Sequence, residues 1–309
     1  MLTSFVLGID GGGTKTVALL ADPQGTCYGR GQAGSSNYHT QGEKAATAAL
    51  DIAIQNAFQD AGLRPQPIAA IALGLAGVDR PEDIVIFNRW AEHALPGARI
   101  SVTNDSELTL AAGTPAGWGI AAICGTGSIV VGRAQTGSRI RADGWGYLLG
   151  DDGSGFAVGL AALRAVAAAH DGRGPETILH SLVMPYCHVH EPVALIRWIY
   201  RDRIPTSEVA GLAALVFEAA DLGDGMAAAI VQQAAAGLAA SIVAVARRLG
   251  SQQAWPCALG GGLIANSPLY QAEVRAEVAA RDVELKPVTV VADPVQGAVI
   301  LARRLLGEE

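Results

Sequence analysis

Two glycine-rich loops each follow a short apolar run, and both have the composition of a phosphate-binding loop. The first contains Asp10, Gly11, Gly12, Gly13, Thr14 and Lys15, and the second contains Gly125, Thr126, Gly127 and Ser128. Because glycine lacks a Cβ, successive backbone N–H groups in such loops can point at one anion. Two loops that grip one nucleotide suit phosphoryl transfer, in which the protein mainly positions groups and neutralises charge. A glycine turn that Asp10 caps is the structural alternative for the first loop.

The first loop resembles a P-loop in part of its pattern. Gly8 and Gly13 have the required spacing. However, Thr14 precedes Lys15, and a strand rather than a helix is expected to follow. Asp10 is the candidate to hold Mg²⁺ through water, since magnesium keeps much of its hydration in proteins. Lys15 either neutralises phosphate charge or is a solvated surface lysine.

An aspartate stands where an α/β sheet usually places ligand groups. Asn104 and Asp105 follow a predicted strand at residues 100–103. A carboxylate at that position can accept the proton of a hydroxyl as its oxygen attacks phosphorus, so Asp105 is the candidate base. The structural alternative is that Asp105 caps a helix at residues 106–112.

Residues 143–154 combine aromatic, acidic and glycine residues just before a predicted helix, which suits a site for a polyhydroxylated substrate. Asp151 can accept hydrogen bonds from hydroxyl groups, whereas Asp152 and Ser154 are also suitable helix caps. The candidate substrate contacts in this segment are Gly144, Trp145 and Asp151. Asn37 lies in a polar loop that could reach the same substrate.

A third glycine cluster follows an apolar strand and consists of Gly260, Gly261 and Gly262. The nucleoside part of a nucleotide could lie on this flat backbone, and a tight strand-to-helix turn would have the same composition. Ser267 and Pro268 then predict a helix start, with a cap followed by proline at the first helical position.

The elements that must position these residues alternate between strands and helices, which predicts an α/β domain with a largely parallel sheet. Residues 5–10 and 16–21 form a predicted hairpin, followed by a third strand. Apolar residues at three- and four-residue spacing predict a helix over residues 43–61. A strand at 68–75 and a helix at 81–93 complete the series before the strand at 100–103.

The opening pattern of strand, glycine loop, strand and turn recurs after about 115 residues, which indicates a duplicated domain rather than a solenoid. Chance similarity of two ordinary hairpins is the alternative. Glycines at 113 and 117 mark the boundary, so the predicted domains are residues 1–114, with the first loop and the base, and residues 115–309, with the second loop and the nucleoside motif. The second half is predicted to be mainly helical, with helices at 154–170, 192–200, 207–220 and 226–249 and strands at 257–259 and 288–291.

Composition excludes several classes of protein. The 309 residues, half of them hydrophobic, are enough for two cores. The chain has 22 basic against 29 acidic residues and no basic cluster, so nucleic acid is not an expected partner. Residues 226–246 are rich in alanine and include glutamines, which predicts a buried helix rather than a membrane span. Residues 1–10 lack the features of a signal peptide.

The four cysteines, Cys27, Cys124, Cys187 and Cys257, lie far apart and form no CxxC pair. The sequence therefore predicts neither a zinc site nor a disulfide framework, and it favours a cytoplasmic location.

Taken in order, these motifs resemble the BadF/BcrA-type ATPase family of the sugar kinase, heat-shock 70 and actin superfamily, and most closely its N-acetylglucosamine kinases. The resemblance spans nearly the whole chain and includes both phosphate loops, residues 104–105, residues 144–154 and residues 260–262. It implies two actin-like, ribonuclease H-like domains with an interdomain cleft, and ATP with Mg²⁺ as cofactors.

The resemblance also implies an activity: phosphorylation of an amino sugar at its 6-hydroxyl, with N-acetylglucosamine or glucosamine as the expected acceptor. In this family the aspartate that matches Asp105 takes the proton of that hydroxyl, and the residues that match Asn37 and Asp151 contact the sugar. Asn104, Gly144 and Trp145 complete the expected contacts. Ile129 stands where human-type enzymes have an asparagine near the sugar, so the resemblance does not carry recognition of the N-acetyl group over to this chain. Glucosamine, N-acetylmannosamine, N-acetylmuramic acid and other amino sugars remain alternative acceptors.

Two other functional classes are compatible with the family. Some relatives are ATPases that activate a dehydratase or reductase and carry an iron–sulfur cluster between subunits, which requires cysteine thiolates. Cys124 precedes the second loop, but no second cysteine is near it in the sequence. A sensor without catalytic activity is the other class, although Asp10 and Asp105 are both present. A homodimer is the association expected for a soluble enzyme.

Overall fold

The first five strands form a mixed sheet whose centre is the strand that leads into the first glycine loop. The computed structural model describes residues 4–78, 80–114, 116–201, 205–250, 252 and 254–307. The strands of this sheet are β1 (Phe5–Gly11), β2 (Thr16–Ala21), β3 (Cys27–Ala33), β4 (Ile68–Leu75) and β5 (Arg99–Asn104), in the order β3-β2-β1-β4-β5. β1 pairs antiparallel with β2 and parallel with β4, which itself pairs parallel with β5. The predicted hairpin and parallel strands are confirmed.

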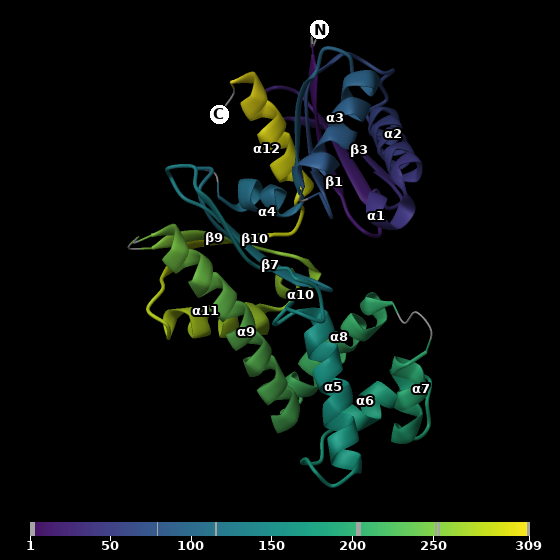
Figure 1. The fold of residues 1–309 in the computed structure, drawn as a ribbon, viewed down its shortest axis with the longest axis vertical. Helices are drawn as coiled ribbons and strands as arrows, with labels where there is room; N and C mark the ends of the chain where they lie inside the picture. Colours follow the sequence, from purple (N-terminus) through teal and green to yellow (C-terminus); the bar gives the residue numbers. More distant parts are fainter. Residues whose placement is uncertain are drawn as a thin grey trace. The chain divides into compact units, whose positions relative to one another are not determined.

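Helices cover both faces of this sheet because side chains alternate along each strand. Phe5, Leu7 and Ile9 of β1 pack against α2 (Glu43–Asp60) and α3 (Pro81–Ala94). Val6, on the opposite face, packs against α12 (Val295–Leu306). The remaining helices of this unit are α1 (Tyr38–Gln41) and α4 (Ser106–Gly113). Figure 1 shows α12 on the side of the sheet away from α2 and α3.

The chain divides into two compact units, and the first is discontinuous in sequence. The first unit runs through Gly117 and takes in the segment from Asp293 onward, and the second is Trp118–Ala292. The predicted division placed all of residues 115–309 together. In the structure, the segment that contains α12 joins the first unit, because its apolar side chains bury one face of that unit's sheet.

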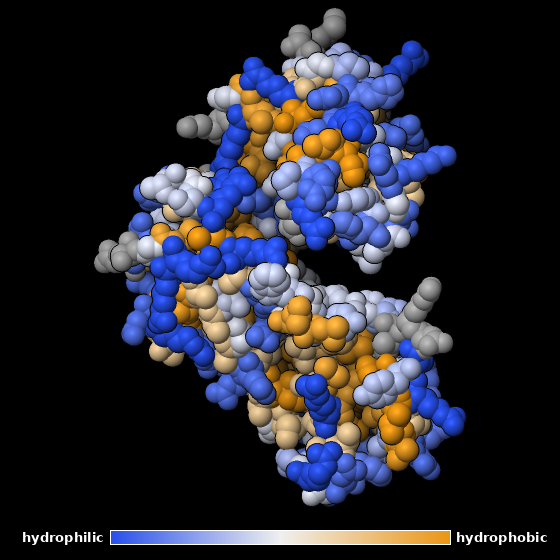
Figure 2. Space-filling model, in the orientation of Figure 1, coloured by the Kyte–Doolittle hydropathy of each residue, from blue (hydrophilic) through white to orange (hydrophobic). Residues whose placement is uncertain are grey.

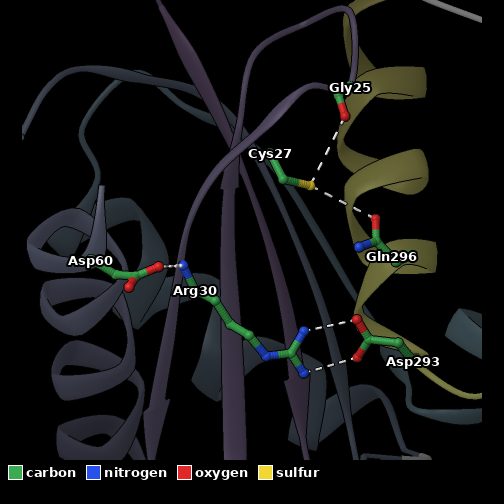
Figure 3. Close-up of polar contacts among 6 residues, drawn as sticks. All are labelled: Gly25, Cys27, Arg30, Asp60, Asp293 and Gln296. Carbon is green, nitrogen blue, oxygen red and sulfur yellow. Dashed lines mark hydrogen bonds and ion pairs between the residues drawn. The ribbon is translucent and has the colours of Figure 1, made fainter. Parts of the chain in front are cut away.

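Arg30 attaches the segment before α12 to the first unit (Figure 3). Its Nη1 donates to Asp293 Oδ2 at 2.8 Å and its Nη2 to Asp293 Oδ1 at 2.9 Å, which is a bidentate ion pair. The backbone N–H of Arg30 donates to Asp60 Oδ2 at 2.8 Å, and Cys27 Sγ lies 3.8 Å from Gln296 Oε1. These contacts hold β3 to both α2 and the start of α12.

Two glycines allow α4, which follows Asp105, to lie close to its neighbours. A Cβ at Gly74 would come within 2.2 Å of the Leu108 side chain, and one at Gly297 would come within 1.9 Å of the Leu108 carbonyl oxygen. Leu108 is fully buried. The absence of a side chain on β4 and on α12 at these points therefore determines where α4 lies.

The second unit repeats the topology of the first, which confirms the predicted duplication and the α/β fold class. Its sheet has the order β10-β9-β6-β7-β8. β6 pairs antiparallel with β7 and parallel with β9, as β1 does with β2 and β4. The strands are β6 (Gly119–Cys124), β7 (Ser128–Arg133), β8 (Arg139–Asp143), β9 (Trp255–Gly260) and β10 (Leu285–Val291).

Most of the second unit is helical, as predicted. Its helices are α5 (Gly155–His170), α6 (Leu179–Tyr186), η1 (Pro192–Ala194), α7 (Leu195–Ile199), α8 (Thr206–Asp221), α9 (Gly225–Leu249), α10 (Gly262–Ala265) and α11 (Pro268–Ala279). Figure 2 shows hydrophobic side chains at the surface near α6 and α7, where Val193 and Ile196 are each 59% exposed.

The helix α9 is the buried helix that the alanine-rich segment predicted. By length and composition alone it is apolar enough to cross a membrane. In the structure, Leu238, Ala239 and Ile242 belong to the core of the second unit, and the helix packs on the sheet at β7 and β8.

Gly297→Ala should destabilise the first unit, because the added methyl group meets the Leu108 carbonyl oxygen and forces α12 away from α4. We expect the free energy of unfolding to fall by about 1–3 kcal/mol, the usual cost of overpacking. Urea denaturation followed by circular dichroism measures it. Gly225→Ala is the matched control: it begins α9 with open space around its Cα, so the change should stay within about 0.5 kcal/mol. Equal stability of the two variants would contradict the packing argument.

Candidate functional site

The candidate catalytic residues of the first unit lie at one edge of its sheet. Asp10 of β1 is paired with Gly74 of β4, and Leu75 of β4 is paired with Asn104 of β5. The three strands are parallel and neighbouring strands lie about 4.8 Å apart, so their carboxyl ends are level at this edge. The sheet therefore brings Asp10 and Asp105 to the same edge.

The capping role that Asp105 was given as an alternative belongs to its neighbour. Asp105 is the N-cap residue of α4, but its side chain accepts no hydrogen bond from the described first turn of that helix. Asn104 Oδ1 accepts the N–H of Ser106 at 3.0 Å instead. The Asn104 amide oxygen thus satisfies the first N–H of the helix.

The first glycine loop is closed at its base and exposed at its tip. The Gly12 N–H donates to Lys15 O at 2.8 Å, and Ser35 Oγ donates to Gly12 O at 3.2 Å. A Cβ on Gly11 would lie 2.2 Å from Ser36 Oγ, so only glycine fits there. Gly13, Thr14 and Lys15 are exposed. An anion would therefore meet the tip of the loop, since the Gly12 N–H is already in use.

Asn37 begins a short helix beside this loop. Its Oδ1 accepts the N–H of His39 at 3.1 Å, and its amide lies near Gly77, where an added Cβ would be 3.6 Å from Asn37 Nδ2. His39 Nε2 is 3.1 Å from Gly77 O. Since Gly77 follows β4, Asn37 is near the same edge of the sheet as Asp105.

The surroundings of the Asp10 carboxyl group disfavour its charged form. Burial, followed by the negative charge of Asp105, raises the pKa of Asp10 to about 6, against the opposing effect of the Lys15 and Arg30 charges. Asp293 adds a smaller effect in the same direction as Asp105. A cation placed here would relieve this unfavourable charge, so the electrostatics fit the predicted metal-associated role.

A magnesium ion that is bound through water needs few protein ligands. Among the residues that the structure describes, no group of three or more His, Cys, Asp or Glu side chains is arranged to hold a metal ion. Magnesium usually binds proteins through one or two carboxylates and completes its shell with water and substrate phosphate. Asp10 can serve in that way without a closed protein cage.

The second glycine loop is braced by the start of α5. The Gly155 N–H donates to Gly125 O at 2.8 Å and the Phe156 N–H donates to Thr126 O at 3.1 Å, and the Gly125 N–H donates to Gly127 O at 2.9 Å. Ser128 is only 4% exposed, and its hydroxyl lies within hydrogen-bond distance of two acceptors in the 143–152 segment. The parts of this loop that remain open to a phosphate belong to the residues before Ser128.

Asp143 organises the acidic segment, although the sequence analysis assigned it no role. Its carboxylate accepts the N–H groups of Gly144 at 2.8 Å, Asp151 at 2.6 Å and Asp152 at 2.9 Å, and it lies 3.3 Å from Ser128 Oγ. Asp143 itself has φ of 63°. An aspartate at a strand end directly before glycine was the available signal, because aspartate both tolerates this conformation and binds nearby N–H groups.

The other candidate contacts in this segment have different surroundings. Asp151 lies against the second loop, where a Cβ on Gly127 would be 2.7 Å from Asp151 Oδ2. Burial and the charge of Asp143 raise the pKa of Asp151. Trp145 is 67% exposed, and the Arg141 guanidinium lies 5.3 Å from the centre of its ring. Gly144 packs against Ile129, and Ser154 caps α5 by accepting the Ala157 N–H.

The third glycine cluster lies beside the second loop, and its members differ. Gly261 has φ of 90° and packs on the backbone of Cys124, where an added Cβ would be 2.5 Å from Cys124 O. Gly262 begins α10 and lies near Gly125. The requirement for a tight turn therefore accounts for Gly261. Gly262 lines a pocket of the second unit.

A pocket of about 1060 Å³ in the second unit opens from the second glycine loop. Its walls come from α8 on one side and from α10 and the start of α11 on the other. The lining residues are Gly125, Thr126, Gly155, Ser207, Ala210, Gly211, Ala213, Ala214, Phe217, Glu218, Asp221, Leu222, Gly262, Leu263, Asn266, Ser267, Pro268 and Leu269. A largely apolar cleft of this size beside a phosphate loop suits a nucleotide. The sequence indicated the loop but not the contribution of α8.

Cys124 is buried and hydrogen-bonded. Its Sγ lies 3.2 Å from Gly153 O, the same oxygen that accepts the Tyr270 hydroxyl at 2.6 Å, and burial raises the pKa of Cys124 to about 12. All four cysteines are free thiols. A cluster ligand shared between subunits must be an exposed thiolate, so the position of Cys124 argues against an iron–sulfur role.

Comparison with known proteins identifies the relationship that the motifs suggested. The sequence model of the BadF/BadG/BcrA/BcrD ATPase family matches residues 7–302. An N-acetyl-D-glucosamine kinase of Dictyostelium discoideum is 32% identical, over 98% of each chain. An N-acetylmuramic acid/N-acetylglucosamine kinase of Clostridium acetobutylicum is also 32% identical, over 97% of this chain and 98% of that protein.

A solved structure agrees with these relatives. A protein of Chromobacterium violaceum, described as a candidate N-acetylglucosamine kinase, matches with a TM-score of 0.76 and 31% identity. The match covers 98% of this chain and 100% of that one. The duplicated α/β fold is thus the fold of this group of proteins.

Asp10→Asn should remove a pH-dependent loss of stability. Because the pKa of Asp10 is about 6 in the folded protein and 3.8 in its unperturbed state, the native state binds more protons between these values. The contribution of the Asp10 carboxyl group to the free energy of unfolding is therefore present below about pH 4 and is lost as pH rises through about 6. The stability of the variant relative to the wild type should grow across this window. Urea denaturation at a series of pH values measures it, with the exposed Glu92→Gln as control; a pH-independent difference would contradict the expected shift.

Asp143→Asn should loosen the 143–152 segment. Asparagine tolerates the backbone conformation at this position, but it replaces one acceptor oxygen by an amide donor and removes the charge. We expect the free energy of unfolding to fall by about 1–3 kcal/mol and hydrogen exchange to become faster at the amides of Gly144, Asp151 and Asp152. Mass spectrometry or NMR measures the exchange. Asp152→Asn is the matched control, and equal exchange in the two variants would be evidence against the organising role of Asp143.

Proposed function

The chain belongs to the BadF/BadG/BcrA/BcrD ATPase family, and from this relationship we propose that it is an ATP-dependent kinase for an amino sugar, most simply N-acetylglucosamine. The observation that carries the proposal is the pocket of about 1060 Å³ that begins at Gly125 and Thr126. It combines a loop that suits phosphates with an apolar cleft that suits a nucleoside. Both relatives that are 32% identical include N-acetylglucosamine in their names, which supports the choice of acceptor, and one of them also names N-acetylmuramic acid.

In the proposed reaction the 6-hydroxyl oxygen of the sugar attacks the γ-phosphorus of ATP. A bond forms between that oxygen and phosphorus, the bond from phosphorus to the bridging oxygen breaks, and ADP leaves. The hydroxyl proton passes to the Asp105 carboxylate. Support for this role comes from the strand register that places Asp105 at the edge of the sheet.

The first loop and Asp10 are proposed to act on the phosphate side of the reaction. Gly13, Thr14 and Lys15 form the exposed tip, which can bind phosphate oxygens through N–H groups and the Lys15 ammonium. We infer that Asp10 holds Mg²⁺ through water, and the metal would neutralise phosphate charge. The charge of Asp105 and the burial of Asp10 make a nearby cation favourable.

The sugar contacts are proposed residue by residue within each unit. In the first unit, Asn37 and Asn104 lie near the edge that carries Asp105. In the second unit, Asp151 lies against the second loop, and Gly144 and Trp145 precede it in the same segment. Acidic and amide side chains with an exposed aromatic ring match the hydroxyl groups and apolar face of a sugar. Ile129 packs on Gly144 and therefore affects the conformation of the segment that contains Gly144, Trp145 and Asp151.

The remaining features of the proposal concern the cellular setting. An enzyme that uses ATP, with four free cysteines, fits a cytoplasmic location. A homodimer is the association that soluble enzymes most often adopt, and we propose it on that general ground. The activating role for a dehydratase or reductase is disfavoured because Cys124 is buried and hydrogen-bonded.

Asp105→Asn should lower turnover by about 10²- to 10⁴-fold, the usual contribution of a general base, and leave nucleotide binding largely intact. The assay measures ADP release with ATP, Mg²⁺ and a panel of acceptors: N-acetylglucosamine, glucosamine, N-acetylmannosamine, N-acetylmuramic acid and glucose. The charge-matched control is Glu92→Gln, an exposed change on α3 that should not alter turnover.

The panel also distinguishes the classes of function. Release of ADP that depends on one amino sugar and is lost in Asp105→Asn supports both the activity and the base. Unchanged turnover in that variant would remove Asp105 from its role. Slow ATP hydrolysis that no sugar stimulates would contradict the kinase proposal and would favour an ATPase that acts on a protein partner.

A further inference from the structure

The pocket of the second unit has two chemically different ends. At one end lie the backbone of Gly262 and the hydroxyl of Thr126, which are suited to phosphate oxygens. At the other end are Glu218 and Asp221. Among the described residues that line the pocket, these two are the only charged ones. Since carboxylates repel phosphates, the phosphates of a bound nucleotide must lie toward the loop.

The helix α8 sets the distance between the two ends. Ala210 marks the loop end, because a Cβ on Gly155 would lie 3.2 Å from Ala210 Cβ. Along an α-helix with a rise of 1.5 Å per residue, Glu218 lies about 12 Å and Asp221 about 16 Å beyond Ala210. A ligand that extends from the loop along this wall therefore brings its far, nucleoside end to the two carboxylates.

The walls between the two ends are apolar. Ala214 and Phe217 belong to α8, and Leu263 and Leu269 come from the facing side. A flat aromatic base suits the space between such walls. The polar edge of the base and the ribose must then contact the carboxylate end of the pocket.

The polar groups at that end are acceptors. A carboxylate only accepts hydrogen bonds, and neither Glu218 nor Asp221 forms a side-chain hydrogen bond or ion pair within the part of the chain that the structure describes. Such an edge favours ligand groups that donate.

We propose that Glu218 and Asp221 select the nucleotide by accepting hydrogen bonds from donors on its nucleoside, namely the ribose hydroxyls and the amino group of adenine. This inference rests on the proposed function, because it assumes that the pocket holds the phosphate donor. It goes further in assigning the choice among nucleotides to two residues of α8. A base with a carbonyl at the position of the adenine amino group presents an acceptor to the same edge and is disfavoured.

The test is direct binding, which needs no sugar and no turnover. Isothermal titration calorimetry of the full chain compares ADP with 2′-deoxy-ADP, which lacks one ribose hydroxyl, and with inosine diphosphate, which replaces the amino group by a carbonyl. Loss of a donor to a charged acceptor should weaken binding about 10- to 100-fold. The two analogues separate ribose recognition from base recognition.

Glu218→Ala and Asp221→Ala are the test variants. Both side chains are exposed and lie on a helix, where alanine is well tolerated, so the fold should be retained and circular dichroism can verify it. Each variant should bind ADP more weakly and lose most of the preference for ADP over at least one analogue. Glu191→Ala, an exposed change outside the pocket, is the control and should keep the wild-type preferences.

The outcomes separate this inference from the function on which it rests. A wild type that binds all three diphosphates equally, or variants that keep the full wild-type preference, would overturn the role of the two carboxylates while leaving the kinase proposal intact. A wild type that binds no ADP would overturn both.

Discussion

Backbone hydrogen bonds between parallel strands hold the strand ends level at one edge of each sheet, and the proposed chemistry depends on that alignment. In the first unit the register that pairs Asp10 with Gly74 also pairs Leu75 with Asn104. A slip of one residue would turn every side chain of a strand to the opposite face. The buried apolar faces of β1 and β4 prevent such a slip, so the hydrophobic core determines the position of the carboxylate that we propose as the base.

Beyond the strand ends, hydrogen bonds to single side chains hold the backbone in place. The Asp143 carboxylate holds three backbone N–H groups of the 143–152 segment, and Asn104 starts α4. The raised pKa of Asp10 is a second local feature of this edge: burial and the neighbouring Asp105 carboxylate disfavour the charged form of Asp10. Binding sites often carry such local destabilisation because the ligand, rather than the protein, completes them.

Much of this arrangement could be predicted from the sequence, because local patterns encode it. The helix over residues 43–61 appears as α2 (Glu43–Asp60), the strand at 68–75 as β4, and the repeat of the opening hairpin as the shared topology of the two sheets. The site residues of each glycine loop were recognisable because their backbone requirements are local. Contacts between distant segments left no such pattern. The return of α12 to the first unit, the bonds made by Asp143, and the wall that α8 contributes to the pocket all depend on packing that no short stretch of sequence specifies.

The discontinuity of the first unit has a consequence for how the chain folds as it is made. Val6 and Val17 pack against α12, which lies almost three hundred positions later in the sequence and is the last helix described. The second unit, by contrast, is continuous and has its whole core available before α12 leaves the ribosome. Domains usually fold in the order of their synthesis. Here the order is reversed in part: the second unit can finish first, and one face of the first sheet stays exposed until α12 packs on it.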